Sequence, residues 1–127
     1  MAKGSDDRKP LGRRGEEAAR EALKRSGYRI LEQNYLCPLG EIDLVARQGR
    51  TLIFVEVKSE SGGTGILPKD RVDARKQRKL LRLAQFYMKE KRIQGVSARF
   101  DVVQVRFAEI GGPQVDIIPN AFDAPET

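Results

Sequence analysis

Two short runs of apolar residues carry ionisable side chains in their interiors. The run at 41–46 contains Glu41 and Asp43, and the run at 53–58 contains Glu56 and Lys58. Side chains two positions apart on a strand point to the same face, so each run places its charged groups side by side. Burying such groups is costly unless they pair or bind a metal ion. Two carboxylates with a neighbouring lysine suit metal-dependent hydrolysis of a phosphodiester.

The turn between the runs decides whether the charged pairs meet. A two-residue loop at 49–50, with glycine first, is typical of a type II′ turn. It would place Asp43 opposite Glu56 and Glu41 opposite Lys58. A loop shifted back by one residue would pair the two glutamates on the same face, whereas a three-residue loop would send the second pair to the other face. We favour the first register.

The alternative to a metal site is a set of cross-strand ion pairs on a solvated sheet face. Val45, Leu52 and Phe54 share the face of the charged groups in the favoured register, which argues against full exposure. Two carboxylates that face each other also repel unless a cation lies between them. The pattern therefore favours a metal site.

Composition limits the chemistry that this chain can perform. It has no histidine and one cysteine, Cys37, which excludes histidine-dependent triads, zinc ribbons and an internal disulfide. We interpret Cys37 as a small apolar residue in a reducing cytoplasm. Hydrolysis must then rely on carboxylates, lysine and a hard cation, for which Mg²⁺ or Mn²⁺ is the natural choice.

The length of 127 residues fits one domain, which we place at 11–123 between a disordered tail at 1–10 and a second tail at 124–127. No stretch of about 18 apolar residues could cross a membrane. The charged N-terminus also lacks the apolar segment of a secretory signal. These features predict a cytoplasmic protein.

The first helix is expected at 12–26 and ends at Gly27. Glu16 lies on its apolar stripe, three residues before Ala19, while Glu17 is turned away. A carboxylate at that place either interacts with the helix dipole or points toward the sheet, and its position alone does not decide between them.

Further along the chain, strand and helix patterns alternate with turns. Strands are expected at 28–36, 41–47 and 51–58, a glycine-rich loop at 59–69, a long helix at 71–92, and strands at 98–107 and 114–118. The order of one helix, three strands, one helix and two strands predicts an α/β sandwich with a mixed sheet.

Positive charge is concentrated on the long helix. The chain has a net charge of +6, and residues 71–92 hold nine basic residues against two acidic ones. This distribution suits a polyanionic partner, although a solvated helix face would look the same. We select the residues near the start and on the outer face as candidate phosphate contacts: Arg75, Lys76, Arg78, Lys79 and Arg82. Lys76 differs from the rest because it falls on the inner stripe.

Asp43 followed by Glu56-x-Lys58, with Glu16 on the preceding helix, resembles the PD-(D/E)xK nuclease superfamily. The layout is similar to that of archaeal Holliday-junction resolvases. The chain resembles the bacterial YraN family more closely still, over residues 12–122. Segments that carry this likeness include Gly15-Glu16, Gly27-Tyr28, Asn34, Gly40-Glu41-Ile42-Asp43, Phe54-Val55-Glu56-Val57-Lys58, Lys76 and Arg99-Phe100-Asp101-Val102-Val103.

The resemblance implies a restriction-endonuclease-like fold and a role for each matching residue. Asp43 and Glu56, with the backbone carbonyl of Val57, would coordinate the divalent ion. Lys58 would orient or deprotonate the attacking water. Glu16 matches the helix carboxylate of the resolvases. The proline that precedes the first aspartate in the superfamily is replaced here by Ile42.

The leading functional hypothesis is therefore a metal-dependent endonuclease acting on DNA, with branched or recombination intermediates as candidate substrates. The alternative is a nucleic-acid-binding module with the nuclease fold and no turnover. A third is an interaction protein in which the charged strands form a polar network. Resolvase-like enzymes act as dimers so that two cuts can be placed symmetrically, which makes a homodimer an expectation of the resemblance.

Overall fold

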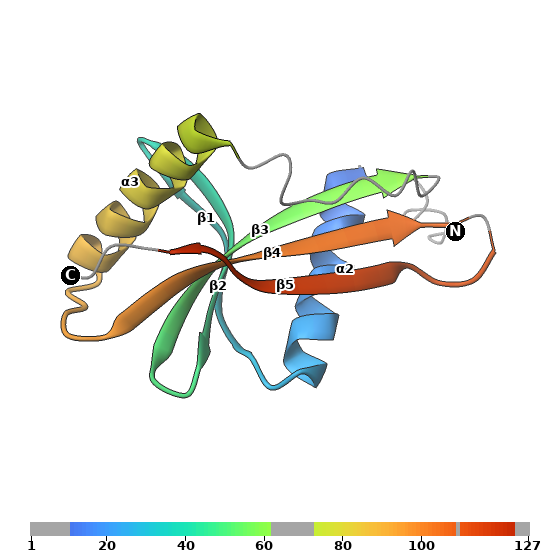
Figure 1. The fold of residues 1–127 in the computed structure, drawn as a ribbon, viewed down its shortest axis with the longest axis horizontal. Helices are drawn as coiled ribbons and strands as arrows, with labels where there is room; N and C mark the ends of the chain where they lie inside the picture. Colours follow the sequence, from blue (N-terminus) through green and yellow to red (C-terminus); the bar gives the residue numbers. More distant parts are fainter. Residues whose placement is uncertain (1–10, 62–72, 109, 124–127) are drawn as a thin grey trace, which may run out of the picture.

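The computed structural model describes residues 11–61, 73–108 and 110–123, which form two helices and one sheet (Figure 1). The elements are α2 (Leu11–Arg25), β1 (Arg29–Cys37), β2 (Gly40–Gln48), β3 (Thr51–Ser61), α3 (Ala74–Glu90), β4 (Ser97–Phe107) and β5 (Gln114–Asp123). The tails expected at 1–10 and 124–127 lie outside the described residues, as does most of the expected glycine-rich loop. The first three residues of that loop instead continue β3. Neither helix is long and apolar enough to cross a membrane within these ranges.

The five strands form one mixed sheet in the order β1-β2-β3-β4-β5. Strands β3 and β4 are parallel, and the other neighbouring pairs are antiparallel. A parallel pair needs a long crossover connection, which here contains α3. The predicted α/β architecture and the predicted order of elements are confirmed.

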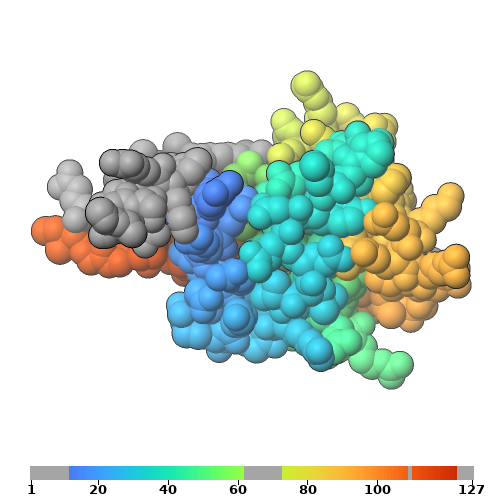
Figure 2. All heavy atoms as spheres, turned by 180° about the vertical axis from the view of Figure 1, so that it is seen from behind, coloured from blue at the N-terminus to red at the C-terminus, as the bar shows by residue number. Residues whose placement is uncertain are grey.

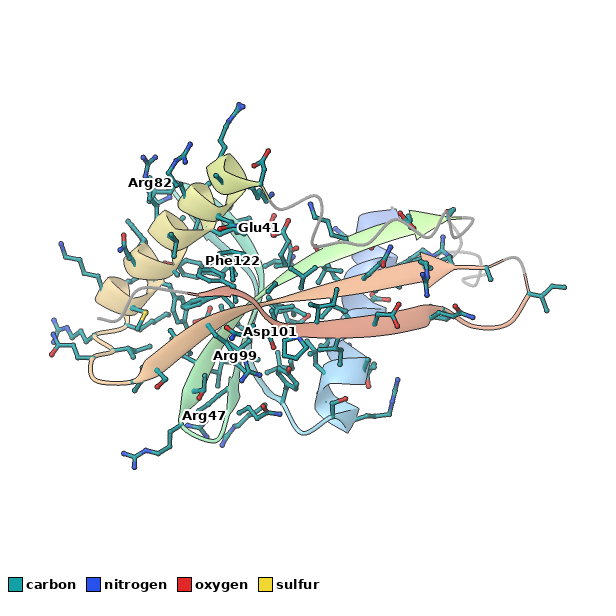
Figure 3. All side chains as sticks on the ribbon, in the orientation of Figure 1. Glu41, Arg47, Arg82, Arg99, Asp101 and Phe122 are labelled. Carbon is teal, nitrogen blue, oxygen red and sulfur yellow. The ribbon has the colours of Figure 1, made fainter. Side chains whose placement is uncertain are left out.

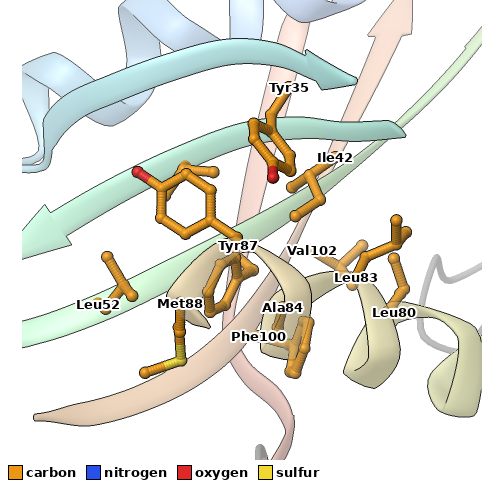
Figure 4. Packing of buried hydrophobic residues seen from close by; sticks show 12 residues of the cluster. Tyr35, Ile42, Leu52, Leu80, Leu83, Ala84, Tyr87, Met88, Phe100 and Val102 are labelled. Atoms are coloured by element: carbon orange, nitrogen blue, oxygen red, sulfur yellow. The ribbon is translucent and has the colours of Figure 1, made fainter. Parts of the chain in front are cut away.

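The two helices cover opposite faces of the sheet. One buried cluster joins Leu23 of α2 to Leu44 and Val55 of the sheet. The other joins α3 to Phe54 and its neighbours, and Figure 4 shows Leu83 and Tyr87 of α3 within it. Phe54 and Tyr87 make a T-shaped contact in this cluster. Because the central strands are buried on both faces, any charged side chain among them needs a partner or a route to solvent.

The turn between β2 and β3 has the predicted register. Gly49 has φ +61°, and Arg50 is not among the non-glycine residues with positive φ in the described part of the chain, as a type II′ turn requires. The ladder runs from Gln48↔Thr51 to Leu44↔Val55. This ladder gives no partner for Asp43, so the predicted position of Asp43 opposite Glu56 lies one step beyond its last pair.

The β1–β2 hairpin twists at Asp43, so that side chains before and after this residue face opposite sides of the sheet. Leu44 packs in the cluster under α2, whereas Ile42, two residues earlier, packs in the cluster under α3. Residues two apart on a regular strand share a face, so the strand rotates between these two positions. Asn34, the position on β1 that lies between the pairs Gln33↔Leu44 and Tyr35↔Ile42, has φ +51°. The expected pairing of Glu41 with Lys58 is therefore wrong, because β2 leaves β3 beyond Leu44 and Glu41 lies opposite Leu36.

Strand β5 extends beyond the expected end at Ile118. The residue that follows, Pro119, has no N–H for the ladder. The structure accommodates it with an irregularity on the edge strand, where Asn120 has φ +54° and donates its N–H to Asp101 Oδ1 at 2.8 Å. Edge strands tolerate proline for this reason.

Candidate functional site

The carboxylate of Asp43 lies where β2 separates from β3. Its Oδ2 atom accepts a hydrogen bond of 2.8 Å from the backbone N–H of Val57. This N–H lies just beyond the last ladder pair, Leu44↔Val55, so the side chain satisfies a backbone donor that the departing strand leaves unpaired. The local twist of β2 thus holds Asp43 against the Glu-x-Lys segment of β3.

Negative charge accumulates around Asp43. Burial is the largest cause that raises its pKa, to about 7, and the next is repulsion from Glu56. The Val57 N–H lowers the pKa, while Glu16 and Glu41 raise it further. Three carboxylates from α2, β2 and β3 therefore act electrostatically on one half-buried carboxyl group. A cation placed among them would relieve this repulsion.

Glu56 pairs with two lysines through a single oxygen. Its Oε2 lies 3.4 Å from Lys58 Nζ and 3.1 Å from Lys76 Nζ. Lys58 follows on β3, whereas Lys76 reaches across from the first turns of α3. The Glu56 side chain is only 12% exposed, so both ammonium groups lie in a partly desolvated environment. Lys76 therefore belongs to this carboxylate cluster.

Glu16 lies on the side of α2 that faces β1 and Asp43. Its Oε1 accepts a hydrogen bond of 2.9 Å from Asn34 Nδ2, and its charge raises the pKa of Asp43. The helix begins at Leu11, which puts Glu16 in the second turn, beyond the reach of a strong helix-dipole effect. Glu17 is exposed. The geometry favours the second of the two roles left open for Glu16, a group directed toward the sheet.

The described ranges contain no group of three or more histidine, cysteine, aspartate or glutamate side chains close enough to hold a metal ion. Asp43 and Glu56 supply two carboxylates, and Glu16 is tied to Asn34. A Mg²⁺ ion commonly takes only one or two protein carboxylates and completes its shell with water and phosphate oxygens. The donors present are compatible with that kind of site.

The five basic residues selected on α3 fall into two groups. Lys76 faces Glu56. The other four, Arg75, Arg78, Lys79 and Arg82, are exposed and surround a hollow of about 380 Å³ together with Leu39. Figure 3 shows Arg82 projecting outward from α3. The helix thus presents an unbroken cationic surface from this hollow to the carboxylate cluster.

A second buried carboxylate, Asp101, was not singled out from the sequence. It is fully buried and accepts hydrogen bonds from Tyr28 Oη at 2.7 Å, Arg99 Nε at 2.9 Å and the Asn120 N–H at 2.8 Å. Figure 3 shows Arg99 and Asp101 together at the centre of the sheet. The spacing Arg99-x-Asp101 within an apolar strand was the available signal, because it puts both side chains on one face.

Comparison with known proteins gives one consistent family. The model of the uncharacterised protein family UPF0102 matches residues 15–105. A UPF0102 protein of Moorella thermoacetica is 48% identical over 118 residues, covering 91% of this chain and 97% of that protein. A relative from Syntrophotalea carbinolica is 46% identical, covering 89% of this chain and 91% of its own length. One from Geobacter sulfurreducens is 40% identical, covering 97% and 96%.

The family model spans the residues that form the candidate site, from Glu16 on α2 to Lys76 on α3, and it also includes Asp101. The relatives match along nearly their whole lengths, so the likeness extends over the complete fold described above. The chain belongs to the UPF0102 family, the YraN family that its sequence resembles.

Proposed function

We propose that this protein is a divalent-metal-dependent endonuclease that hydrolyses phosphodiester bonds of DNA. The observation that carries the proposal is the meeting of Asp43 and Glu56 at the point where β2 leaves β3. The half-buried Asp43 has its pKa raised to about 7 beside Glu56, whose oxygen contacts Lys58. A structural ion pair does not require a second carboxylate, and the repulsion that this carboxylate adds is relieved by a bound cation or by a proton.

The donor set fits a hard cation. Asp43 and Glu56 would hold it, and the carbonyl of Val57 is the third ligand that the superfamily likeness suggests. When bound, a Mg²⁺ or Mn²⁺ ion would polarise a phosphate oxygen and lower the pKa of water. All three donors are oxygen atoms, the ligand type that these ions prefer.

The side chains around the carboxylates have separate tasks in this proposal. Lys58 donates hydrogen bonds to the attacking water or to a non-bridging phosphate oxygen and offsets the charge that develops there. Lys76, the second partner of Glu56, is positioned to hold the phosphate on the helix side. Glu16, fixed by Asn34, orients a water molecule near Asp43. The water oxygen attacks phosphorus and gives up a proton to solvent, the bond to the leaving oxygen breaks, and the leaving oxygen takes up a proton from solvent.

One observation favours a second candidate, a nucleic-acid-binding module without turnover. Glu56 already contacts two ammonium groups, so its charge is compensated without any metal ion. In that case the lysines and the carboxylates would form a closed network, and only the cationic surface of α3 would contact nucleic acid.

Labelled duplex, flap, four-way-junction and single-stranded DNA, incubated with Mg²⁺, Mn²⁺ or a chelator, test the proposal. Wild-type protein should cleave at least one substrate only with metal, and Asp43→Ala should abolish cleavage. Asp116→Ala is the matched control, because Asp116 is an exposed carboxylate paired with Arg106 on β4 and lies outside the candidate site. Salt-dependent binding without cleavage would support the binding module, and absence of both would reject both candidates.

A further inference from the structure

The hollow beside α3 combines four cations with one apolar side chain. Arg75, Arg78, Lys79 and Arg82 surround it, and Leu39 from the turn between β1 and β2 completes it. In the described part of the chain none of these four cations forms an ion pair, in contrast to Lys76 one turn away. Among the described residues, this surface thus presents positive charge without a paired carboxylate around a leucine that is 47% exposed.

The hollow lies next to the carboxylate cluster. A Cβ atom placed on Gly40, the first residue of β2, would lie 3.3 Å from Lys79 Cε, so this lysine packs over the start of the strand that carries Asp43. Figure 2 shows the end of the β1–β2 hairpin beside the beginning of α3. A strand whose phosphate lies at Lys76 would reach the hollow with an adjacent nucleotide.

Leu39 would distinguish between forms of DNA. Cations bind the phosphates of duplex and single strands alike, without regard to base. A leucine gains nothing from phosphates, and in an undistorted duplex the faces of the bases are covered by stacking. An unpaired base offers an apolar face, and proteins that bind unpaired or unstacked bases place apolar or aromatic side chains against it. The volume of about 380 Å³ is near the lower end of small-molecule sites, which suits one nucleotide.

We propose that this hollow binds a single unpaired nucleotide, with its base against Leu39 and its phosphates on the surrounding cations. The inference rests on the proposed nuclease function and adds its substrate class: DNA that has unpaired nucleotides next to the bond that is cut. The apolar contact then selects the substrate, and the cations supply affinity.

Fluorescence anisotropy with a forked DNA and a blunt duplex of the same paired sequence tests this assignment. Measured without divalent metal, wild-type protein should bind the fork more tightly. Leu39→Ala should weaken fork binding by about 5- to 10-fold and leave duplex binding unchanged, given what one base contact contributes. Arg78→Ala should weaken binding of both. Leu36→Ala is the matched control, because Leu36 is on the same hairpin, is 75% exposed and does not line the hollow.

Each other outcome has a defined meaning. Equal loss for fork and duplex in Leu39→Ala, or no loss at all, overturns the nucleotide site while metal-dependent cleavage stands. Fork selectivity that depends on Leu39, in a protein that never cleaves, keeps the nucleotide site and rejects the nuclease. A change in sedimentation of Leu39→Ala that is absent in Leu36→Ala would make the leucine a contact between two copies of the chain and would also overturn the assignment.

Discussion

Asp43 and Asp101 both lie in apolar strands of this protein, and their surroundings give them different roles. Asp101 is saturated by donors from Tyr28, Arg99 and Asn120, so its charge is balanced within the fold. Asp43 receives one backbone N–H and is otherwise surrounded by other carboxylates. The sequence pattern is the same in both cases. The number of donors that the fold supplies is what separates a structural carboxylate from a candidate metal ligand.

The raised pKa of Asp43 predicts a defined dependence of stability on pH. A folded pKa of about 7 against a model value of 3.8 means that the folded state holds a proton which the unfolded state has lost. This contribution to stability is complete below about pH 4 and disappears as the pH rises through about 7. At pH 8 and without metal, Asp43→Asn should be more stable than wild type by about 2 to 4 kcal/mol, at roughly 1.4 kcal/mol per pKa unit.

Urea denaturation at several pH values between 4 and 8.5, with a chelator present, measures this difference. The two proteins should have nearly equal stability near pH 4 and diverge progressively between about pH 4 and pH 7. Asp116→Asn, at an exposed carboxylate, controls for the loss of one charge. If Asp43→Asn is less stable than wild type at pH 8, the repulsion among the carboxylates is not a real feature of the folded protein.

Lys58 and Asp43 should separate metal binding from catalysis. An ammonium group is not a metal ligand, so Lys58→Ala should bind Mn²⁺ nearly as wild type does. It should reduce cleavage by roughly two to four orders of magnitude, the range for a positioned proton-transfer group. Asp43→Ala should lose both properties, because it removes a ligand oxygen. Mn²⁺ titration calorimetry and single-turnover cleavage measure the two properties separately.

Lys91→Ala is the control for the lysine, because Lys91 pairs with Glu32 away from the site. A structural network would behave differently, since removal of either partner would leave an unpaired charge and chiefly lower stability. Cleavage at the wild-type rate by a folded Lys58→Ala protein would show that the activity resides elsewhere.

Helix α2 approaches β3 closely at Gly15. A Cβ atom on Gly15 would lie 1.7 Å from Ser59 Oγ and 2.8 Å from Ser59 Cβ, whereas one on Gly12 would meet nothing within 4 Å. Gly15→Ala should therefore force the helix away from the sheet and reduce stability by about 1 to 3 kcal/mol. Gly12→Ala should be neutral or slightly stabilising, because alanine favours helix.

Thermal melts of both variants check this prediction, and Gly15→Ala combined with Ser59→Gly should recover most of the lost stability. Equal effects at the two glycines would contradict the close contact. Because Glu16 follows Gly15, Gly15→Ala should also shift that carboxylate relative to Asp43.

Most of the elements could be predicted from the sequence because glycines and apolar periodicity mark them directly. Gly27, with φ +92°, ends α2 through bonds from Gly27 N–H to the Lys24 carbonyl and from Tyr28 N–H to the Leu23 carbonyl. The register between β2 and β3 followed from one glycine turn. Other features had no decisive local signal: β2 rotates at Asp43 opposite Asn34, which has φ +51°, a conformation that asparagine adopts more readily than most residues but that its presence does not require.

The candidate site was predictable in part for the same reason. Alternation along β3 places Glu56 and Lys58 on one face, and the two-residue turn brings Asp43 of β2 near them. The second contact of Glu56, to Lys76, joins a strand to a helix that follows a long connection. Its position on the inner stripe showed that Lys76 differed from its neighbours, but only the crossing of α3 over the sheet identifies its partner.

At the scale of the whole molecule, the net charge of +6 predicts affinity for any polyanion, so the location of the charge must be tested separately from its amount. Replacing Arg75, Arg78, Lys79 and Arg82 by alanine removes four charges from one surface of α3. Replacing Lys24, Arg25, Arg47 and Arg50 removes the same number from other exposed positions. Figure 3 shows Arg82 and Arg47 far apart on the molecule.

The two quadruple variants should differ in the salt dependence of DNA binding. Each phosphate contact contributes about 0.9 to the slope of log K against log salt concentration on duplex DNA, because a bound counterion is released. If α3 holds the phosphates, its variant should lose up to about 3 to 4 units of slope and weaken uniformly across sequences. The control variant should keep nearly the wild-type slope, because charges that make no phosphate contact release no counterions. Equal slopes in the two variants would mean that net charge alone attracts DNA and that its binding surface is not on α3.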